Sequence, residues 1–198
     1  MNVYEHTSPE ALSTRSHPWS GSAHDAAHRY TDFRATPAAI RTALEDFRPF
    51  EAYPAIETFY RLLEHLNGPS STLETNDCAL NGAGPNGSAQ FAKRLVCSGR
   101  LMLLFRDLSR NTRPDDMRDL SQEVGLGLSR TAPELGWAAV GVGLMSVRYL
   151  GLPGTARRQL GQQLMLSFWA WGDEEVECMG HLDRTFQAMS SVLCARPW

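Results

Sequence analysis

The chain has 198 residues, of which 42% are hydrophobic and 21% charged; this is the composition of one folded domain and excludes full disorder. Its 19 basic and 22 acidic residues give a net charge of −3, so charge predicts no nucleic acid and no anionic membrane as a partner. The first residues do not form a secretory signal, and no apolar run is long enough to span a membrane. We therefore expect a cytoplasmic protein with no membrane partner.

The four cysteines lie far apart in the sequence and include no CxxC pair. This spacing argues against a disulfide scaffold and against a zinc ribbon. We expect Cys78, Cys97, Cys178 and Cys194 to be reduced and mostly buried.

Residues 1–35 are rich in Ser, His, Thr and Ala and show no sustained hydrophobic period, which predicts a flexible tail. The tail holds four of the six histidines, so a metal-binding tail is a second hypothesis. A helical pair is expected over residues 36–69. Its first helix starts at Thr36-Pro37 and stops at Pro49, and its second runs from Pro54 to Leu66.

Residues 70–198 combine apolar extended segments with amphipathic helices and are expected to form an α+β domain. The sequence predicts a mostly antiparallel sheet with two helices, behind the N-terminal helical pair. The expected extended segments are 73–80, 101–105, 137–149 and 164–171, and the helices begin at Thr112 and Asp173. The inward stripe of the last helix is expected to be Val176, Met179, Leu182, Phe186, Met189 and Leu193.

Two segments of this domain resemble each other. LMLLF at 101–105 matches LMLSF at 164–168 with an offset of 63, and Met117 and Leu120 match Met179 and Leu182 with an offset of 62. A repeated strand–strand–helix unit explains the match, and chance similarity is the alternative. Both strands are apolar at nearly every position, which predicts burial on both faces. If both repeat helices cover one face, the N-terminal helices or a partner chain must cover the other.

The segment Gly82-Ala-Gly84-Pro-Asn-Gly87 satisfies GxGxxG and resembles a dinucleotide phosphate loop. This interpretation needs a helix over 88–96 to hold a pyrophosphate, and it makes the chain a small nucleotide- or flavin-binding enzyme. The preceding strand, TNDCALN, is too polar for such a fold. A hairpin loop built from ordinary turn residues is the favoured interpretation.

Two further groups of residues are candidates for a site. Cys178 and His181 share a helix face at i, i+3 and could ligate a metal, but no second ligand pair matches them, and buried structural roles are favoured. Arginines bracket the central strand and the helix after it, and they could receive carboxylates from a peptide or a partner, or form a solvated rim. The arginines chosen for this role are Arg100, Arg106, Arg110 and Arg113.

Three short segments, NDCAL at 76–80, CSGRLM at 97–102 and LFRDL at 104–108, resemble the MbnC-type partner subunit of methanobactin biosynthesis. The resemblance implies a heterodimer with an iron-dependent oxidase. That complex converts cysteines of a small precursor peptide into oxazolone–thioamide groups. This chain would hold the peptide, bind no cofactor itself and leave the iron to its partner. The apolar strands and the surrounding arginines also favour a peptide-binding subunit, without naming the peptide, since a peptide can add as a strand at a sheet edge.

Overall fold

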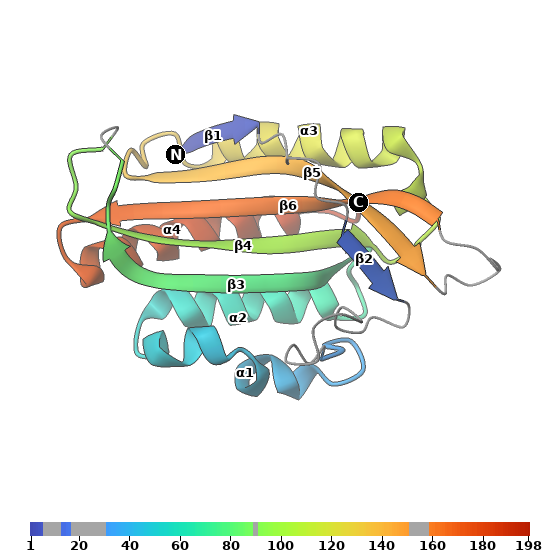
Figure 1. Ribbon diagram of the computed structural model, residues 1–198, viewed down its shortest axis with the longest axis horizontal. Helices are drawn as coiled ribbons and strands as arrows, with labels where there is room; N and C mark the ends of the chain where they lie inside the picture. The colour runs from blue at the N-terminus through green and yellow to red at the C-terminus, as the bar shows by residue number, and fades with distance from the viewer. Residues whose placement is uncertain (6–12, 17–30, 89–90, 151–158) are drawn as a thin grey trace.

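The computed structural model describes residues 1–5, 13–16, 31–88, 91–150 and 159–198, and these form one sheet backed by helices (Figure 1). The path through the sheet is β1-β5-β6-β4-β3, and β2 also pairs with β5. The four long strands pair antiparallel, whereas β1 and β2 run parallel to β5. The expected α+β class is confirmed. The strands are β1 (Asn2–Glu5), β2 (Ser13–Ser16), β3 (Leu73–Pro85), β4 (Leu95–Phe105), β5 (Ala138–Leu150) and β6 (Gln159–Gly172).

The helices gather on one side of the sheet, behind it in the view of Figure 1. Helix α4 crosses the middle of the sheet and packs against both α2 and α3. The long helices are α2 (Pro54–Asn67), α3 (Pro114–Thr131) and α4 (Glu175–Leu193); the shorter ones are η1 (Pro37–Ala39), α1 (Ile40–Ala43), η2 (Glu45–Phe50) and η3 (Arg110–Thr112).

An aromatic cluster joins the sheet to the helices. Phe168 of β6 meets Phe186 of α4 edge-on at 5.0 Å between ring centroids, and it meets Phe59 of α2 at 6.2 Å. All three side chains are fully buried. Edge-to-face contacts of this kind add to the stabilisation that area burial provides. The cluster therefore holds the helix layer on the inner face of the sheet.

The N-terminal helices do not cover the second face, contrary to one of the two expectations for it. Helix α2 lies beside α4 on the helix side, because its Phe59 packs into the same cluster as Phe168. Side chains that alternate with this core point to the other side, which we call the outer face. On β4 and β6 the outer face consists of Val96, Ser98, Arg100, Met102, Leu104, Gln163, Met165, Ser167, Trp169 and Trp171.

The strand–strand–helix repeat matches the architecture. Units β3-β4-α3 and β5-β6-α4 follow one another, and their second strands pair antiparallel in the middle of the sheet. Met102 pairs with Met165, which is its own counterpart at the offset of 63. The central strands of the two units are therefore related by an approximate two-fold axis that passes between these methionines; the helices do not follow it, because α4 packs on β6 and β4 whereas α3 packs on β5 and β6. The expected burial of both faces is confirmed for 101–105, where all five residues are buried, but not for the second strand, where Ser167 and Trp169 keep exposed surface.

Three local expectations need correction. The helix expected from Thr36 to Pro49 is broken into η1, α1 and η2, because the chain leaves helical geometry at Leu44, where ψ is 77°. Val176 does not join the inward stripe of α4 and is 60% exposed; it lies in the first turn of that helix. Within residues 1–35, the segments 2–5 and 13–16 are strands and not tail, because β5 supplies main-chain partners that the local pattern does not reveal.

Candidate functional site

The glycine-rich segment belongs to the β3–β4 hairpin. Gly82 and Gly84 lie within β3, and Gly84 pairs with Val96 of β4. Residues 95–105 are strand, so the helix that a phosphate loop would need over 88–96 is not formed in the described part of that range. The segment belongs to a hairpin as expected, but Gly82 and Gly84 are strand residues and not part of its loop. The strand–turn–helix premise of a nucleotide site at Gly82, Gly84 and Gly87 is wrong. The glycine-rich segment is extended because it pairs with β4, a long-range contact that the local sequence does not show.

The connection between β3 and β4 is tied down at both ends. The Asn86 amide donates hydrogen bonds to the carbonyls of Phe91 and Lys93, at 3.0 and 2.8 Å. Lys93, the only lysine of the sequence, donates to Asp173 at 2.8 Å and to Glu177 at 2.7 Å. Its ammonium also lies 5.1 Å from the ring centroid of Trp137. These contacts fix the connection against the start of α4.

The pKa shifts of Lys93, Asp173 and Glu177 agree with these ion pairs. Hydrogen bonds to Asp173 and then Glu177 raise the pKa of Lys93, and the same lysine lowers the pKa of each carboxylate. All three groups therefore stay charged near neutral pH, and the two carboxylates share the one ammonium. The cluster keeps one net negative charge.

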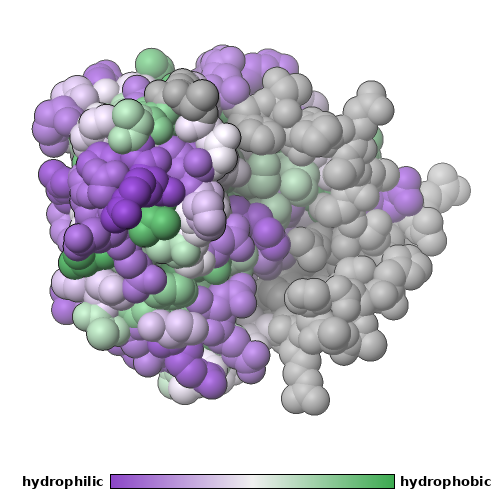
Figure 2. Space-filling view, turned by 60° about the vertical axis from the view of Figure 1, so that its left-hand side comes forward, coloured by the Kyte–Doolittle hydropathy of each residue, from purple (hydrophilic) through white to green (hydrophobic). Residues whose placement is uncertain are grey.

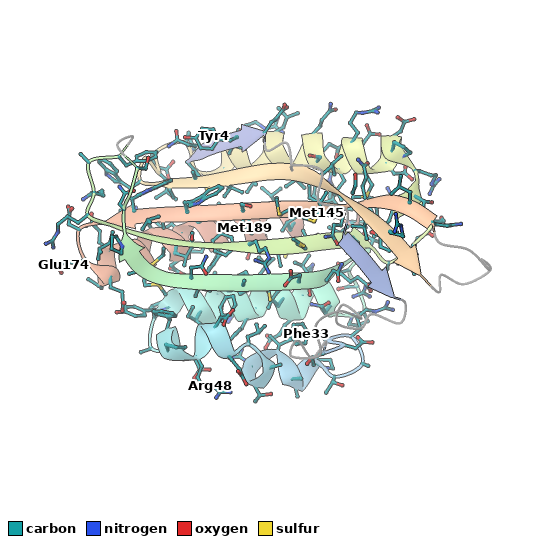
Figure 3. All side chains as sticks on the ribbon, in the orientation of Figure 1. Tyr4, Phe33, Arg48, Met145, Glu174 and Met189 are labelled. Carbon is teal, nitrogen blue, oxygen red and sulfur yellow. The ribbon has the colours of Figure 1, made fainter. Side chains whose placement is uncertain are left out.

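A pocket of about 370 Å³ lies under this connection at the end of the outer face. The described residues that line it are uncharged, and four of the eight are aromatic: Tyr4, Asn86, Gly87, Ser88, Phe91, Val96, Trp169 and Trp171. Phe91 stacks on Trp171 with 4.0 Å between ring centroids, which holds the two rings in place. Tyr4, labelled in Figure 3, comes from β1 and is 41% exposed. Strands β1, β4 and β6 and the hairpin connection thus meet at one concave surface.

The outer face continues from this pocket along the strands. Ser98 pairs with Trp169, and Arg100 pairs with Ser167, so these residues form successive rows beside the pocket. They keep exposed surface, whereas Met102, Leu104 and Met165 further along are buried. We call Val96, Ser98, Arg100, Ser167 and Trp169 the open part of the outer face. On the face shown in Figure 2, hydrophilic residues make up most of the described surface, with hydrophobic residues among them.

The four arginines selected from the sequence do not form one cluster. Arg100 lies on the open part of the outer face, is 46% exposed and pairs with Asp77 of β3 at 3.1 Å. Arg110 and Arg113 lie at the start of α3 and share Asp116, with Arg113 nitrogen 2.8 Å from the carboxylate. Of the four, Arg100 alone is beside the pocket. The periodicity of a sequence does not reveal this separation.

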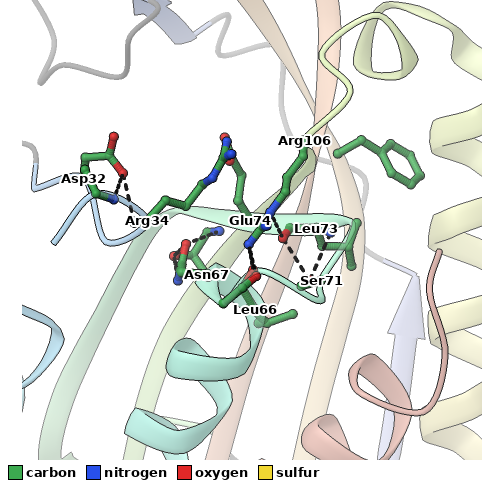
Figure 4. A network of polar contacts seen from close by, with 12 residues as sticks. Asp32, Arg34, Leu66, Asn67, Ser71, Leu73, Glu74 and Arg106 are labelled. Atoms are coloured by element: carbon green, nitrogen blue, oxygen red, sulfur yellow. Dashed lines mark hydrogen bonds and ion pairs between the residues drawn. The ribbon is translucent and has the colours of Figure 1, made fainter. Parts of the chain in front are cut away.

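Arg106 contacts main-chain carbonyls of this chain (Figure 4). Its guanidinium donates to the carbonyls of Leu66 and Leu73, both at 3.1 Å, and to that of Gly68. Leu66 and Gly68 lie at the C-terminus of α2, where carbonyls lack helical partners and a cation is favoured. Burial lowers the pKa of Arg106, with the nearby Arg34 as a smaller cause. Arg106 therefore caps α2 and joins it to β3.

Cys178 and His181 are both buried, and each has a protein partner. His181 Nδ1 lies 2.7 Å from the carbonyl oxygen of Trp171, and the thiols of Cys178 and Cys97 are within contact of each other. Burial raises the pKa of Cys97 to about 12 and also raises that of Cys178. Among the described residues, no three His, Cys, Asp or Glu side chains are placed to hold a metal ion. All four cysteines are free, and Cys97 and Cys178 are buried as expected, whereas Cys78 and Cys194 are only partly buried.

The pocket residues were not predicted from the sequence. Tyr4, Phe91 and Trp169 are separated widely in the chain, and only the dense aromatic run at 168–171 was a usable signal. Its alternation sends Phe168 to the core and Trp169 and Trp171 to the outer face.

Comparison with protein families, curated proteins and solved structures finds no match for this chain. In the part that the structure describes, no helix is both long and apolar enough to cross a membrane.

Proposed function

We propose that this chain is the peptide-recognition subunit of a heteromeric complex that modifies a small precursor peptide. One observation carries the proposal: the open part of the outer face ends in an uncharged aromatic pocket. The described helices pack on the opposite side of the sheet, so this surface faces away from the core they form. Concave, mostly apolar surfaces with a few polar groups are the usual places for ligands.

The dimensions of this surface suit an extended chain. Successive rows on the outer face are two residues apart along β4, or about 7 Å, which is also the spacing of alternate side chains in an extended peptide. A peptide running along β4 from the pocket meets Ser98 and then Arg100. Arg100 with Asp77 offers both signs of charge to its side chains, and β3 ends the sheet on that side. Because β4 is already paired with β3 and β6, contacts of side chains with the pocket and with this charge pair, and not main-chain hydrogen bonds to β4, would set the register of the peptide.

The finer form of the proposal rests on the resemblance of three segments to the MbnC-type family. It assigns an iron-dependent oxidase as the partner subunit and oxazolone–thioamide formation on cysteine as the reaction. Two of these segments, 76–80 and 97–102, lie side by side on β3 and β4 and contain Asp77 and Arg100. The resemblance and the proposed peptide surface therefore coincide on the same pair of strands.

Selection from a random linear peptide library displayed on phage tests the binding function directly. The immobilised full chain is expected to enrich peptides that share a consensus. An Arg100→Glu variant, which reverses the charge beside Asp77, should change the charges in that consensus while leaving the fold intact. Arg118→Glu, on the exposed surface of α3, is the matched control and should return the original consensus. Failure of the full chain to enrich any consensus would contradict the proposal.

A further inference from the structure

We propose that the aromatic pocket receives one large uncharged ring, the side chain of a tryptophan, phenylalanine or tyrosine in the bound peptide. This inference rests on the proposed function and adds the chemical class of the anchoring residue. It concerns the pocket formed by Tyr4, Phe91, Val96, Trp169 and Trp171, with Asn86, Gly87 and Ser88 at its rim.

The size of the pocket admits a large side chain. Its volume of about 370 Å³ is near the lower end of the range for ligand pockets, roughly 300–1,000 Å³. That space holds an aromatic side chain together with neighbouring atoms of the peptide. The remainder of an extended peptide would then lie over the neighbouring rows, where Ser98 and Arg100 are found.

The charges around the pocket specify an uncharged occupant. None of the described lining residues carries a charge. Lys93 is paired with Asp173 and Glu177, and Arg100 is paired with Asp77. A charged side chain would lose its water in the pocket and find no counter-ion among the described lining residues, which is costly. Charge complementarity therefore favours a neutral side chain.

The walls favour a ring over an aliphatic chain. Phe91 and Trp171 are stacked and fixed, since Asn86 and Lys93 anchor the connection that carries Phe91. Trp169 and Tyr4 keep part of their surface exposed. Aromatic pairs gain stabilisation beyond area burial through offset or edge-to-face geometry. A preformed aromatic site also loses little conformational freedom when it binds.

The test uses the peptides enriched by the full chain. These are expected to share one aromatic position, and exchanging that residue for alanine should weaken binding about tenfold or more. Trp169→Ala should weaken the parent peptide similarly but have little further effect on the alanine peptide, because both changes remove the same contact. Trp169→Phe should restore part of the affinity. Tyr4→Ala, at the opposite wall on the edge strand, is a second variant in case Trp169→Ala does not fold.

Controls and readout separate this inference from the proposed function. Leu126→Ala, 60% exposed on α3, should leave the affinity unchanged. In NMR spectra, the indole N–H signals of Trp169 and Trp171 should shift with peptide, whereas that of Trp198 should not. Enrichment without a shared aromatic residue, or additive effects of the two truncations, would overturn the pocket assignment and leave peptide binding standing. No enrichment, with N-acetyltryptophanamide alone shifting both signals, would overturn both proposals and indicate a small-molecule site.

Discussion

Phe168→Ala is expected to lower the free energy of unfolding by about 3–5 kcal/mol, the largest effect of any single substitution proposed for this chain. Phe168 is fully buried and contacts Phe59 of α2 and Phe186 of α4, so its removal leaves a cavity where sheet and helices join. Urea denaturation, followed by circular dichroism, measures the change as a lower midpoint at constant m-value.

Val176→Ala serves as the control for this measurement. Val176 belongs to α4 but is 60% exposed, so we expect a change within about 0.5 kcal/mol. A loss below about 1 kcal/mol for Phe168→Ala would show that the aromatic cluster is not packed as described. It would also remove the argument that α2 lies on the inner face, and with it the exposure of the outer face.

Arg106→Ala is expected to lower the free energy of unfolding by about 3 kcal/mol. The substitution removes charge-assisted hydrogen bonds to the carbonyls of Leu66, Gly68 and Leu73, each of which contributes roughly 1.5–3 kcal/mol in favourable cases. Because Arg106 keeps some contact with solvent, we place the total near the value of a single strong bond. Urea denaturation again provides the measurement.

Arg113→Ala is the matched control. Arg113 was selected from the sequence for the same role, but it is 57% exposed and pairs with Asp116 at the surface, so its loss should cost about 0.5 kcal/mol or less. If Arg106→Ala left stability unchanged and abolished binding of the enriched peptides, Arg106 would belong to the peptide surface after all. The structural assignment made from its carbonyl contacts would then be wrong.

Hydrophobic periodicity was sufficient to predict the long elements of the fold. The stripe Met117, Leu120, Val124 and Leu128 is buried in α3 as expected, and most of the stripe of α4 is buried as well. The repeat was visible because both units place similar side chains on their central strands. These are local patterns, and their burial follows from amphipathic packing on a single sheet.

Long-range contacts account for what could not be predicted. Strand β1 has no pattern of its own and forms because β5 offers main-chain partners at residues 139–142. Arg106 donates hydrogen bonds to carbonyls at the end of α2, about 40 residues earlier in the chain. The pocket joins Tyr4, Phe91 and Trp169, which only the folded sheet brings together. The spacing of residues in the sequence does not predict such long-range contacts.

Native mass spectrometry of the untagged chain, isolated gently from its own host, tests the central claim most directly. We predict a complex that contains this chain, a second polypeptide with bound iron and, under mild activation, a short peptide that is released. Detection of the chain with a flavin or nucleotide and no second polypeptide would contradict the claim. So would the chain alone at concentrations where a subunit complex would persist.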